Sequence, residues 1–161
     1  NINNLPFVVS VANYNNPKQS VITGRKDAVA AAGEKCMEQG ALKAVELNVS
    51  GPFHSSLLKG AGEKLSAVLD KVTVNDITVP YVANVNAQYI KDKNEVKDLL
   101  VRQVSSSVRW QQSLENMIAD GADEFIEVGP GHTLTGFVKK IDRSLKTVNI
   151  ETVEDLNNYF A

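Results

Sequence analysis

The sequence predicts an α/β fold with a largely parallel sheet. Short runs of apolar and β-branched residues alternate with longer stretches in which apolar residues recur at spacings of three and four. Alternating strand and helix patterns of this kind are typical of α/β domains. Of the 161 residues, 43% are hydrophobic and 22% are charged, which is the ordinary balance of a folded globular chain and excludes a low-complexity one.

The first fifty residues predict the order β-β-α-β. Two β-branched runs flank a cluster of Asn and Pro turn formers, which predicts a hairpin or a close pair of strands. An apolar stripe of helical spacing follows and stops at Gly40, and because Cys36 falls on that stripe we expect it to be buried. The predicted elements are a strand over 7–12, a strand over 20–23, a helix over 26–39 and a strand over 44–49.

The remaining residues continue the alternation and end in a helix. Trp110 begins one of these helices and is most simply a core residue or a residue of a subdomain seam. The Gly129–Gly131 turn precedes another helix, where free backbone amides could hold an anion, although a tight turn is the simpler interpretation. The predicted elements are helices over 55–71, 95–103, 110–119 and 153–159, a helix from 133, and strands over 79–85, 124–128 and 147–150.

Composition excludes several classes of function. The net charge is −2 and no basic block is present, which argues against nucleic acid as a partner. A single cysteine excludes an internal disulfide and any multi-cysteine metal site. No apolar run reaches the roughly 18 residues that a membrane span requires, and no signal peptide is visible. We therefore expect no membrane partner and a reducing, cytoplasmic compartment.

Two histidines are candidates for chemistry. His54 lies where a loop meets a predicted helix, and the positive end of the helix dipole favours a neutral imidazole that can act as a general base. The alternative is that His54 only caps the helix or packs beside Phe53. His132 belongs to the Gly129–Gly131 turn. A histidine base in an α/β fold usually serves a serine on a Gly-x-Ser-x-Gly elbow, which this sequence lacks, so it offers half of a catalytic pair.

The segment 48–57, Asn-Val-Ser-Gly-Pro-Phe-His-Ser-Ser-Leu, strongly resembles the histidine motif of the malonyl-CoA:acyl-carrier-protein transacylase family. Further matches to that family follow in the same order and cover essentially the whole chain. They are Val11–Asn15 with Pro17, Val82–Val85, Leu100–Gln103, Val108–Trp110 and Glu127–Gly136.

The resemblance implies a fold and a division of the chain. Residues 51–161 would form the C-terminal part of an α/β-hydrolase-like acyltransferase core with a parallel sheet. Residues 1–50 would form an incomplete ferredoxin-like ββαβ small subdomain. The family's nucleophile elbow, oxyanion hole and carboxylate-binding Arg belong to an N-terminal half that is absent from this sequence. We therefore expect the chain to be a C-terminal fragment of the enzyme.

The resemblance also implies site residues. His54 would be the catalytic base, and the backbone carbonyl of Gln103 would accept a hydrogen bond from the histidine's other ring nitrogen. Phe53 resembles the malonyl-selective form of the motif, in which the ring crowds an α-methyl group. The expected catalytic residues are His54 and Gln103, and the expected substrate-binding residues are Phe53, Asn13, Asn15 and Asn84. No metal and no cofactor are expected.

The implied reaction is malonyl transfer from malonyl-CoA to the phosphopantetheine thiol of acyl carrier protein through a malonyl-serine, in fatty acid biosynthesis. The expected partners are acyl carrier protein, malonyl-CoA and the N-terminal half of the enzyme. Two alternatives stay open: a discrete acyltransferase of a polyketide synthase, and a non-catalytic module that docks a carrier protein. Five basic residues could form a positive rim for the anionic partners, or could simply be solvated; they are Arg102, Arg109, Lys139, Lys140 and Arg143.

Overall fold

The computed structural model describes residues 9–161, and its first elements form an antiparallel hairpin. Strand β1 (Val9–Asn16) pairs with β2 (Gln19–Gly24), and the Asn16 side chain closes the turn by accepting a hydrogen bond from the Lys18 amide at 3.0 Å. The hairpin predicted from the turn residues is therefore confirmed. Residues 7–8 of the predicted first strand lie outside the described residues.

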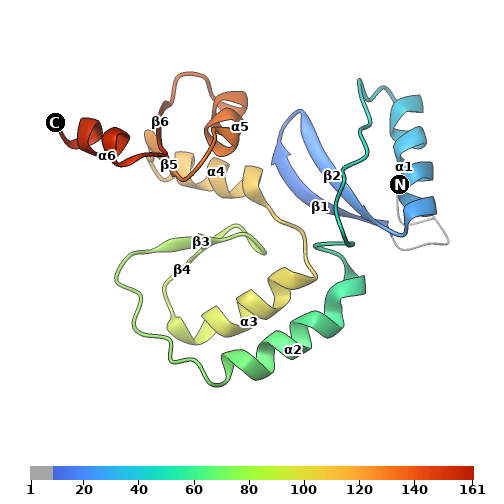
Figure 1. The fold of residues 1–161 in the computed structure, drawn as a ribbon, viewed down its shortest axis with the longest axis horizontal. Helices are drawn as coiled ribbons and strands as arrows, with labels where there is room; N and C mark the ends of the chain where they lie inside the picture. The colour runs from blue at the N-terminus through green and yellow to red at the C-terminus, as the bar shows by residue number, and fades with distance from the viewer. Residues whose placement is uncertain (1–8) are drawn as a thin grey trace.

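Helix α1 (Lys26–Glu38) lies against this hairpin, and Figure 1 shows the three elements together. Ala28 and Ala32 are the buried residues of this helix, and their side chains are small enough for a close approach to neighbouring elements. Cys36 is exposed, so the prediction of a buried cysteine was wrong. The apolar stripe continues to the end of the helix, but the buried positions lie in its first two turns only.

The strand predicted over 44–49 is also wrong, because this segment has no regular structure and is exposed. Its apolar residues alternate as in a strand, yet Val45, Leu47 and Val49 are 59%, 53% and 61% exposed. A strand is stable only when its backbone is hydrogen-bonded to a neighbour, and among residues 9–161 no strand pairs with this segment. The alternating pattern is present without the partner that would give it structure.

The next elements are two helices that pack side by side (Figure 1). A short 3₁₀ turn, η2 (Ser56–Leu58), leads into α2 (Lys59–Leu69), which contacts α3 (Lys93–Val104). Gly62 is buried at their crossing, where a Cβ atom would lie 3.0 Å from the Val101 carbonyl oxygen. The helices predicted over 55–71 and 95–103 are confirmed, although the first begins as a 3₁₀ turn.

A second antiparallel hairpin lies between these helices in the chain. It is formed by β3 (Tyr81–Ala83) and β4 (Gln88–Ile90), whereas the sequence predicts one strand over 79–85. The intervening turn places Ala87 at φ 58°, and Asn116 holds the Ala87 carbonyl at 2.7 Å. The hydrophobic core cluster of this region is formed by Ala83, Val85, Ile90 and Leu99.

The C-terminal third contains a parallel β-α-β unit. The strands β5 (Glu124–Val128) and β6 (Lys146–Ile150) pair in parallel and are joined by α5 (Thr133–Ile141). Helix α4 (Trp110–Ala119) packs on α5. Leu114, Val138 and Leu145 form the core of this unit, with Trp110 against them as predicted. The chain ends in α6 (Val153–Phe160), which begins with a capping box of Thr152 and Asp155.

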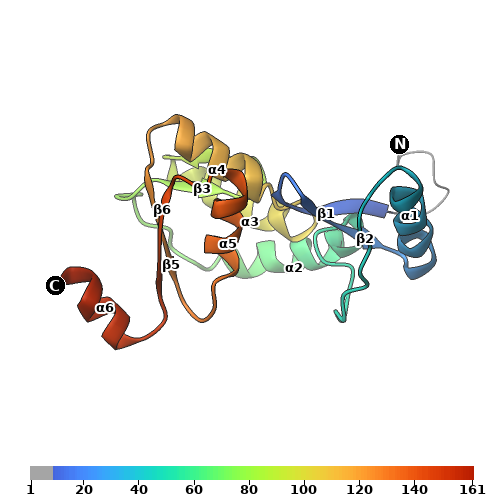
Figure 2. The same cartoon turned by 90° about the horizontal axis from the view of Figure 1, so that it is seen from above.

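The segment after α3 connects these regions to the first hairpin. The Val108 amide donates to the Ala12 carbonyl at 2.7 Å, and the Val108 carbonyl accepts from the Tyr14 amide at 2.9 Å. Ser107 Oγ donates to the Val11 carbonyl. Residues 107–108 therefore lie beside β1. Figure 2 shows the resulting elongated arrangement, with α1 toward one end and α6 at the other.

The described residues thus have a mixed α/β fold with three separate two-stranded sheets, of which only β5–β6 is parallel. The predicted alternation of strands and helices is confirmed for the C-terminal unit. Within residues 9–161, the structure has no helix that is both long and apolar enough to cross a membrane.

Candidate active site

His54 lies on the short loop that joins the exposed segment to η2. Its φ is 59°, the left-handed region that residues with a side chain rarely adopt. The loop around it is tightly hydrogen-bonded: the Phe53 amide donates to the Gly51 carbonyl at 2.9 Å, and Ser55 Oγ donates to the Pro52 carbonyl at 2.7 Å. The cap position of η2 is occupied by Ser55, so His54 does not cap the helix.

The imidazole of His54 contacts a backbone carbonyl 49 residues further along the chain. The His54 Nδ1 atom lies 3.1 Å from the Gln103 carbonyl oxygen, which belongs to the last turn of α3. This oxygen also accepts from the Ser106 amide at 3.4 Å, and because a carbonyl in the last turn of a helix has a second lone pair and carries partial negative charge, it can accept from the histidine as well. A carbonyl oxygen can only accept, so Nδ1 carries the proton, and the neutral ring keeps its lone pair on Nε2.

The side chain of Gln103 binds the loop that follows it. Its Nε2 donates to the Ser106 carbonyl at 3.1 Å and reaches the Ser107 carbonyl at 3.5 Å. Ser107 in turn is hydrogen-bonded to β1. Gln103 therefore contributes twice: its main chain holds the histidine, and its amide folds the loop that borders the histidine.

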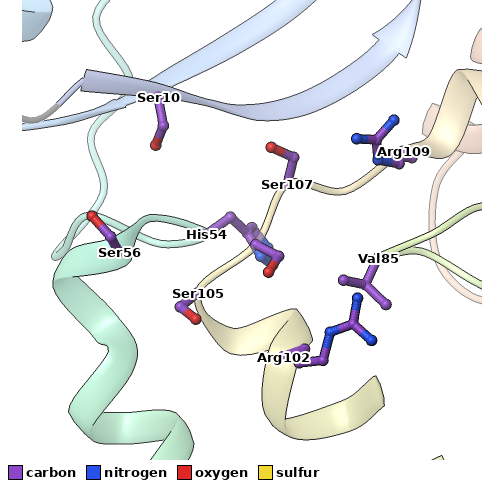
Figure 3. Close-up of a pocket in the computed structure, with 9 residues that line it drawn as sticks. Ser10, His54, Ser56, Val85, Arg102, Ser105, Ser107 and Arg109 are labelled. Atoms are coloured by element: carbon purple, nitrogen blue, oxygen red, sulfur yellow. The ribbon is translucent and has the colours of Figure 1, made fainter. Parts of the chain in front are cut away.

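The His54 side chain lines a pocket of about 430 Å³ (Figure 3). Ser10 and Ser107 lie on one side of the imidazole, and Ser105 and Arg102 lie on the other. The lining is mostly hydroxyl and guanidinium groups, from Ser10, His54, Ser56, Val85, Arg102, Ser105, Ser106, Ser107 and Arg109. Arg102 is ion-paired with Asp98 at 3.1 Å, whereas no ion pair of Arg109 is formed among the described residues. A proton acceptor with arginines in the same pocket suits a substrate that loses a proton and carries negative charge.

The other four predicted residues are not among those that line this pocket. Phe53 is 50% exposed beside Gly51, Asn13 bridges to Val108, and the Asn84 carbonyl accepts the Arg109 amide at 2.8 Å. Asn15 lies partly buried in β1. The structure therefore brings together His54 and the Gln103 carbonyl, and a substrate-binding role for the other four stays a prediction.

The serines of the pocket were not predicted. Ser105, Ser106 and Ser107 are consecutive in the sequence, and this run was the one available signal. Nothing in the sequence indicated that β1 would bring Ser10 to the same place. Ser10 Oγ is buried and has no hydrogen-bond partner among the described residues.

Two of the first amides of α5, after the Gly129–Gly131 turn, are already bonded to a side chain of this protein. The carboxylate of Glu127 accepts the Leu134 amide at 3.0 Å and the Thr135 amide at 2.7 Å, and so occupies this helix terminus. Burial acts to raise the pKa of Glu127, but the hydrogen bonds from the two amides and the Thr135 hydroxyl, together with the nearby His132, hold the pKa below the ordinary value. The tight-turn interpretation is the better one.

No metal cluster accompanies the histidine. Within residues 9–161, the structure has no group of three or more His, Cys, Asp or Glu side chains placed to hold an ion.

Comparison with known proteins identifies the protein family to which the chain belongs. A model of the acyl transferase domain family matches residues 3–156, and the chain belongs to this family. The chain is a homologue of the malonyl-CoA:acyl carrier protein transacylases. It is 45% identical over 150 residues to the malonyl CoA-acyl carrier protein transacylase of Bacillus subtilis, which covers 91% of this chain and 47% of that protein. The chain thus spans about half the length of the curated relatives it matches.

Solved structures agree with this assignment. A crystal structure of an acyl carrier protein S-malonyltransferase from Vibrio cholerae matches with a TM-score of 0.92 and 41% identity, over 96% of this chain and 50% of that one. A malonyl-transacylase in complex with its type II PKS acyl-carrier protein matches with a TM-score of 0.90 and 36% identity, over 94% and 49%. The resemblance stated from the sequence motifs is therefore confirmed.

Proposed function

We propose that this chain supplies the histidine base of an acyltransferase that moves malonyl from malonyl-CoA to the phosphopantetheine thiol of acyl carrier protein, in fatty acid biosynthesis. The observation that carries the proposal is the contact between His54 Nδ1 and the Gln103 carbonyl at 3.1 Å. It holds the ring in the tautomer whose Nε2 can accept a proton. Such a base is what a serine nucleophile requires.

The first half-reaction uses His54 as a base and then as an acid. Nε2 takes the proton of a serine hydroxyl as the serine oxygen attacks the thioester carbon of malonyl-CoA. The carbon–sulfur bond then breaks, and the imidazolium returns the proton to the departing CoA thiolate. The Gln103 carbonyl stabilises the transient imidazolium as the carboxylate does in a Ser-His-Asp triad, without a buried full charge.

The second half-reaction runs the same steps with the carrier protein. Nε2 takes the proton of the phosphopantetheine thiol as the sulfur attacks the malonyl-serine ester. The serine oxygen leaves and recovers a proton from the imidazolium. Malonyl-carrier protein is released, and His54 and the serine return to their starting states.

The serine is supplied, in this proposal, by the half of the transacylases that the chain does not span. The resemblance assigns the nucleophile elbow, the oxyanion hole and the carboxylate-binding Arg to that half. It also places residues 1–50 in a ferredoxin-like small subdomain and residues 51–161 in the acyltransferase core. The cytoplasmic setting expected from the sequence suits these partners, since CoA esters and carrier proteins are water-soluble.

Intact-mass spectrometry tests the proposal directly. The chain is incubated with malonyl-CoA, with and without the complementary half of the Bacillus subtilis relative. We expect a malonyl adduct on the added half only, and its loss when the chain carries His54→Ala. An adduct on this chain alone would show that Cys36 or one of its own serines is a nucleophile, and would overturn the mechanism. Carrier-protein binding with no adduct on either half would favour the docking module instead.

A second candidate differs only in the carrier protein. One solved relative, the malonyl-transacylase in complex with its type II PKS acyl-carrier protein, favours an enzyme that serves a polyketide synthase. The ratio of transfer rates to a fatty-acid carrier and a polyketide carrier, measured on the reconstituted enzyme, separates the two candidates.

A further inference from the structure

We propose that Ser55 is a positioning residue for His54. In this proposal its hydroxyl keeps the histidine backbone in the left-handed conformation that directs the imidazole toward the Gln103 carbonyl. The inference deepens the proposed function and rests on it for its kinetic consequence, whereas its structural part concerns this chain alone.

The histidine needs such support because its backbone is strained. His54 has φ 59°, and among residues 9–161 only His54 and Ala87 have a positive φ without being glycine. An unfavourable conformation of this kind persists only where the surroundings impose it. The ring contact to Gln103 is one such constraint, but it acts at the far end of a side chain with two rotatable bonds.

Ser55 imposes the second constraint, on the backbone itself. Its Oγ donates to the Pro52 carbonyl at 2.7 Å, and this bond closes a turn that encloses Phe53 and His54. Ser55 is 1% exposed, so water does not compete for the hydroxyl. The same turn is supported on its other side by the Phe53 amide, which donates to the Gly51 carbonyl.

The Ser55 hydroxyl does not make the hydrogen bond that a serine at a helix N-cap usually makes. Ser55 is the N-cap residue of η2, with φ −125° and ψ 162°, where a serine side chain normally accepts a helix amide. No such capping bond is formed, and the side chain reaches back to Pro52 instead. The first amides of η2 therefore have no side-chain cap, and the Ser55 hydroxyl stabilises the turn that contains His54 instead.

Removal of the hydroxyl therefore has a specific consequence. Without the bond to Pro52, the His54 backbone can relax to a negative φ, which swings the imidazole away from the Gln103 carbonyl. The ring then loses the acceptor that selects the Nδ1–H tautomer. A merely structural serine would lower the stability of the chain and leave the tautomer unchanged.

Nitrogen NMR of the imidazole rings tests this in the full chain. The sequence has two histidines, so His132 serves as an internal reference. We expect the wild type to show His54 mainly as the Nδ1–H tautomer, and Ser55→Ala to shift it toward the Nε2–H form that free imidazole favours. Ser113→Ala is the matched control, because Ser113 is equally buried and its Oγ donates to the Arg109 carbonyl at 2.9 Å. It should leave both histidines unchanged.

The kinetic arm uses the chain combined with the complementary half of the Bacillus subtilis relative. We expect Ser55→Ala to lower kcat about 10- to 100-fold with little change in KM for malonyl-CoA, because the base is displaced while the substrate contacts remain. Ser113→Ala should keep the wild-type kcat. If the proposed function itself is wrong, the wild-type chain also shows no transfer, and this result distinguishes the two failures.

A conservative variant covers the case in which Ser55→Ala does not fold. Ser55→Cys has nearly the same size and a weaker donor, and should give a tautomer ratio and a kcat between those of wild type and the mutant without a donor. A folded Ser55→Ala or Ser55→Cys variant with the wild-type tautomer ratio would overturn the inference.

Discussion

The hydrogen bond between His54 and a main-chain carbonyl has consequences for mutation. A triad carboxylate can be deleted by one substitution, but the Gln103 carbonyl remains whatever side chain the residue carries. The Gln103 amide is a separate contribution, since it holds the carbonyls of Ser106 and Ser107. The two predicted catalytic residues, His54 and Gln103, should therefore respond to substitution very differently.

His54→Ala should lower malonyl transfer by about 10²- to 10⁴-fold, the usual contribution of a general base. Gln103→Ala should lower it only about fivefold, since one or two loop hydrogen bonds of about 1 kcal/mol are lost while the carbonyl stays. Steady-state transfer rates of the reconstituted enzyme check both values. Equal losses in the two variants would mean that the main-chain contact is not the important one.

Phe53→Ala should relax the choice of acyl group. In the proposed function its ring crowds an α-methyl substituent, and one methyl group is typically worth about 1–3 kcal/mol of discrimination. We expect the ratio of methylmalonyl to malonyl transfer to rise about tenfold. Competition between the two CoA esters measures this ratio, and Phe137→Ala, on α5, is the aromatic control. An unchanged ratio would remove Phe53 from the acyl site.

At the scale of elements, α5 shows how a helix terminus is stabilised from outside the helix. Glu127 lies at the end of β5 and binds the first amides of α5, while the Asn149 side chain from β6 holds the Gly131 carbonyl at 2.7 Å. The Gly-Pro-Gly turn is thus held from both strands of the β-α-β unit.

Glu127→Gln should destabilise the chain by about 1–2 kcal/mol near neutral pH, because charge-assisted hydrogen bonds become neutral ones. The pKa of Glu127 is lower in the folded chain than its ordinary value of 4.5. Its stabilisation is therefore fully present above pH 4.5 and is lost as the pH falls through the lower folded-state pKa. Denaturant unfolding from pH 7 to 3 should show the difference from wild type shrinking below pH 4.5. A difference that is constant with pH would contradict this assignment.

The positive rim is best tested at Lys140. Lys139 Nζ donates to the carbonyls of Leu145 and Arg143, so its reversal would disturb the loop after α5. Lys140 lies 5.8 Å from the Phe137 ring centre and has no such structural bond among the described contacts. Lys140→Glu should raise the KM for carrier protein a few-fold at low salt and less at high salt. Lys64→Glu, on the exposed side of α2, is the control, and an equal KM in both variants would dismiss the rim.

The sequence predicted elements well wherever local pattern and tertiary partner coincide. The helix over 110–119 and the strands of the parallel unit were found because their apolar residues meet a core in this chain. The strand over 44–49 was wrong because its pattern has no partner within residues 9–161, and β4 was missed because three residues give too short a pattern. His54 was found as a base candidate, but its Gln103 acceptor came only from the family resemblance, since a carbonyl leaves no trace in the sequence.

At the scale of the whole molecule, the chain is unusually open. It exposes 11011 Å². A compact monomer of this mass exposes about 7,900 Å² by the usual scaling with size. Apolar side chains contribute to the excess, including Leu42 and Val128, which are 100% and 79% exposed. Such surface is costly in water and favours association.

We therefore predict that the free chain self-associates or has a low melting temperature. The complementary half of the Bacillus subtilis relative should convert it to a stable one-to-one complex. Sedimentation velocity and thermal melts of the two samples check this prediction. A chain that is monomeric and melts cooperatively on its own would contradict it.

The contacts that hold the histidine also determine at which stage of synthesis it becomes a competent base. The acceptor of His54 is made 49 residues after the histidine itself, and the Ser107 bond to Val11 joins residues 96 apart. Both contacts require closure of long loops, which is slow because many residues must be ordered first. A nascent chain stopped before Gln103 would carry the complete histidine motif with the imidazole unheld. The base therefore becomes competent only after Gln103 and Ser107 have been made, when the first hairpin, the histidine loop and the end of α3 can be joined.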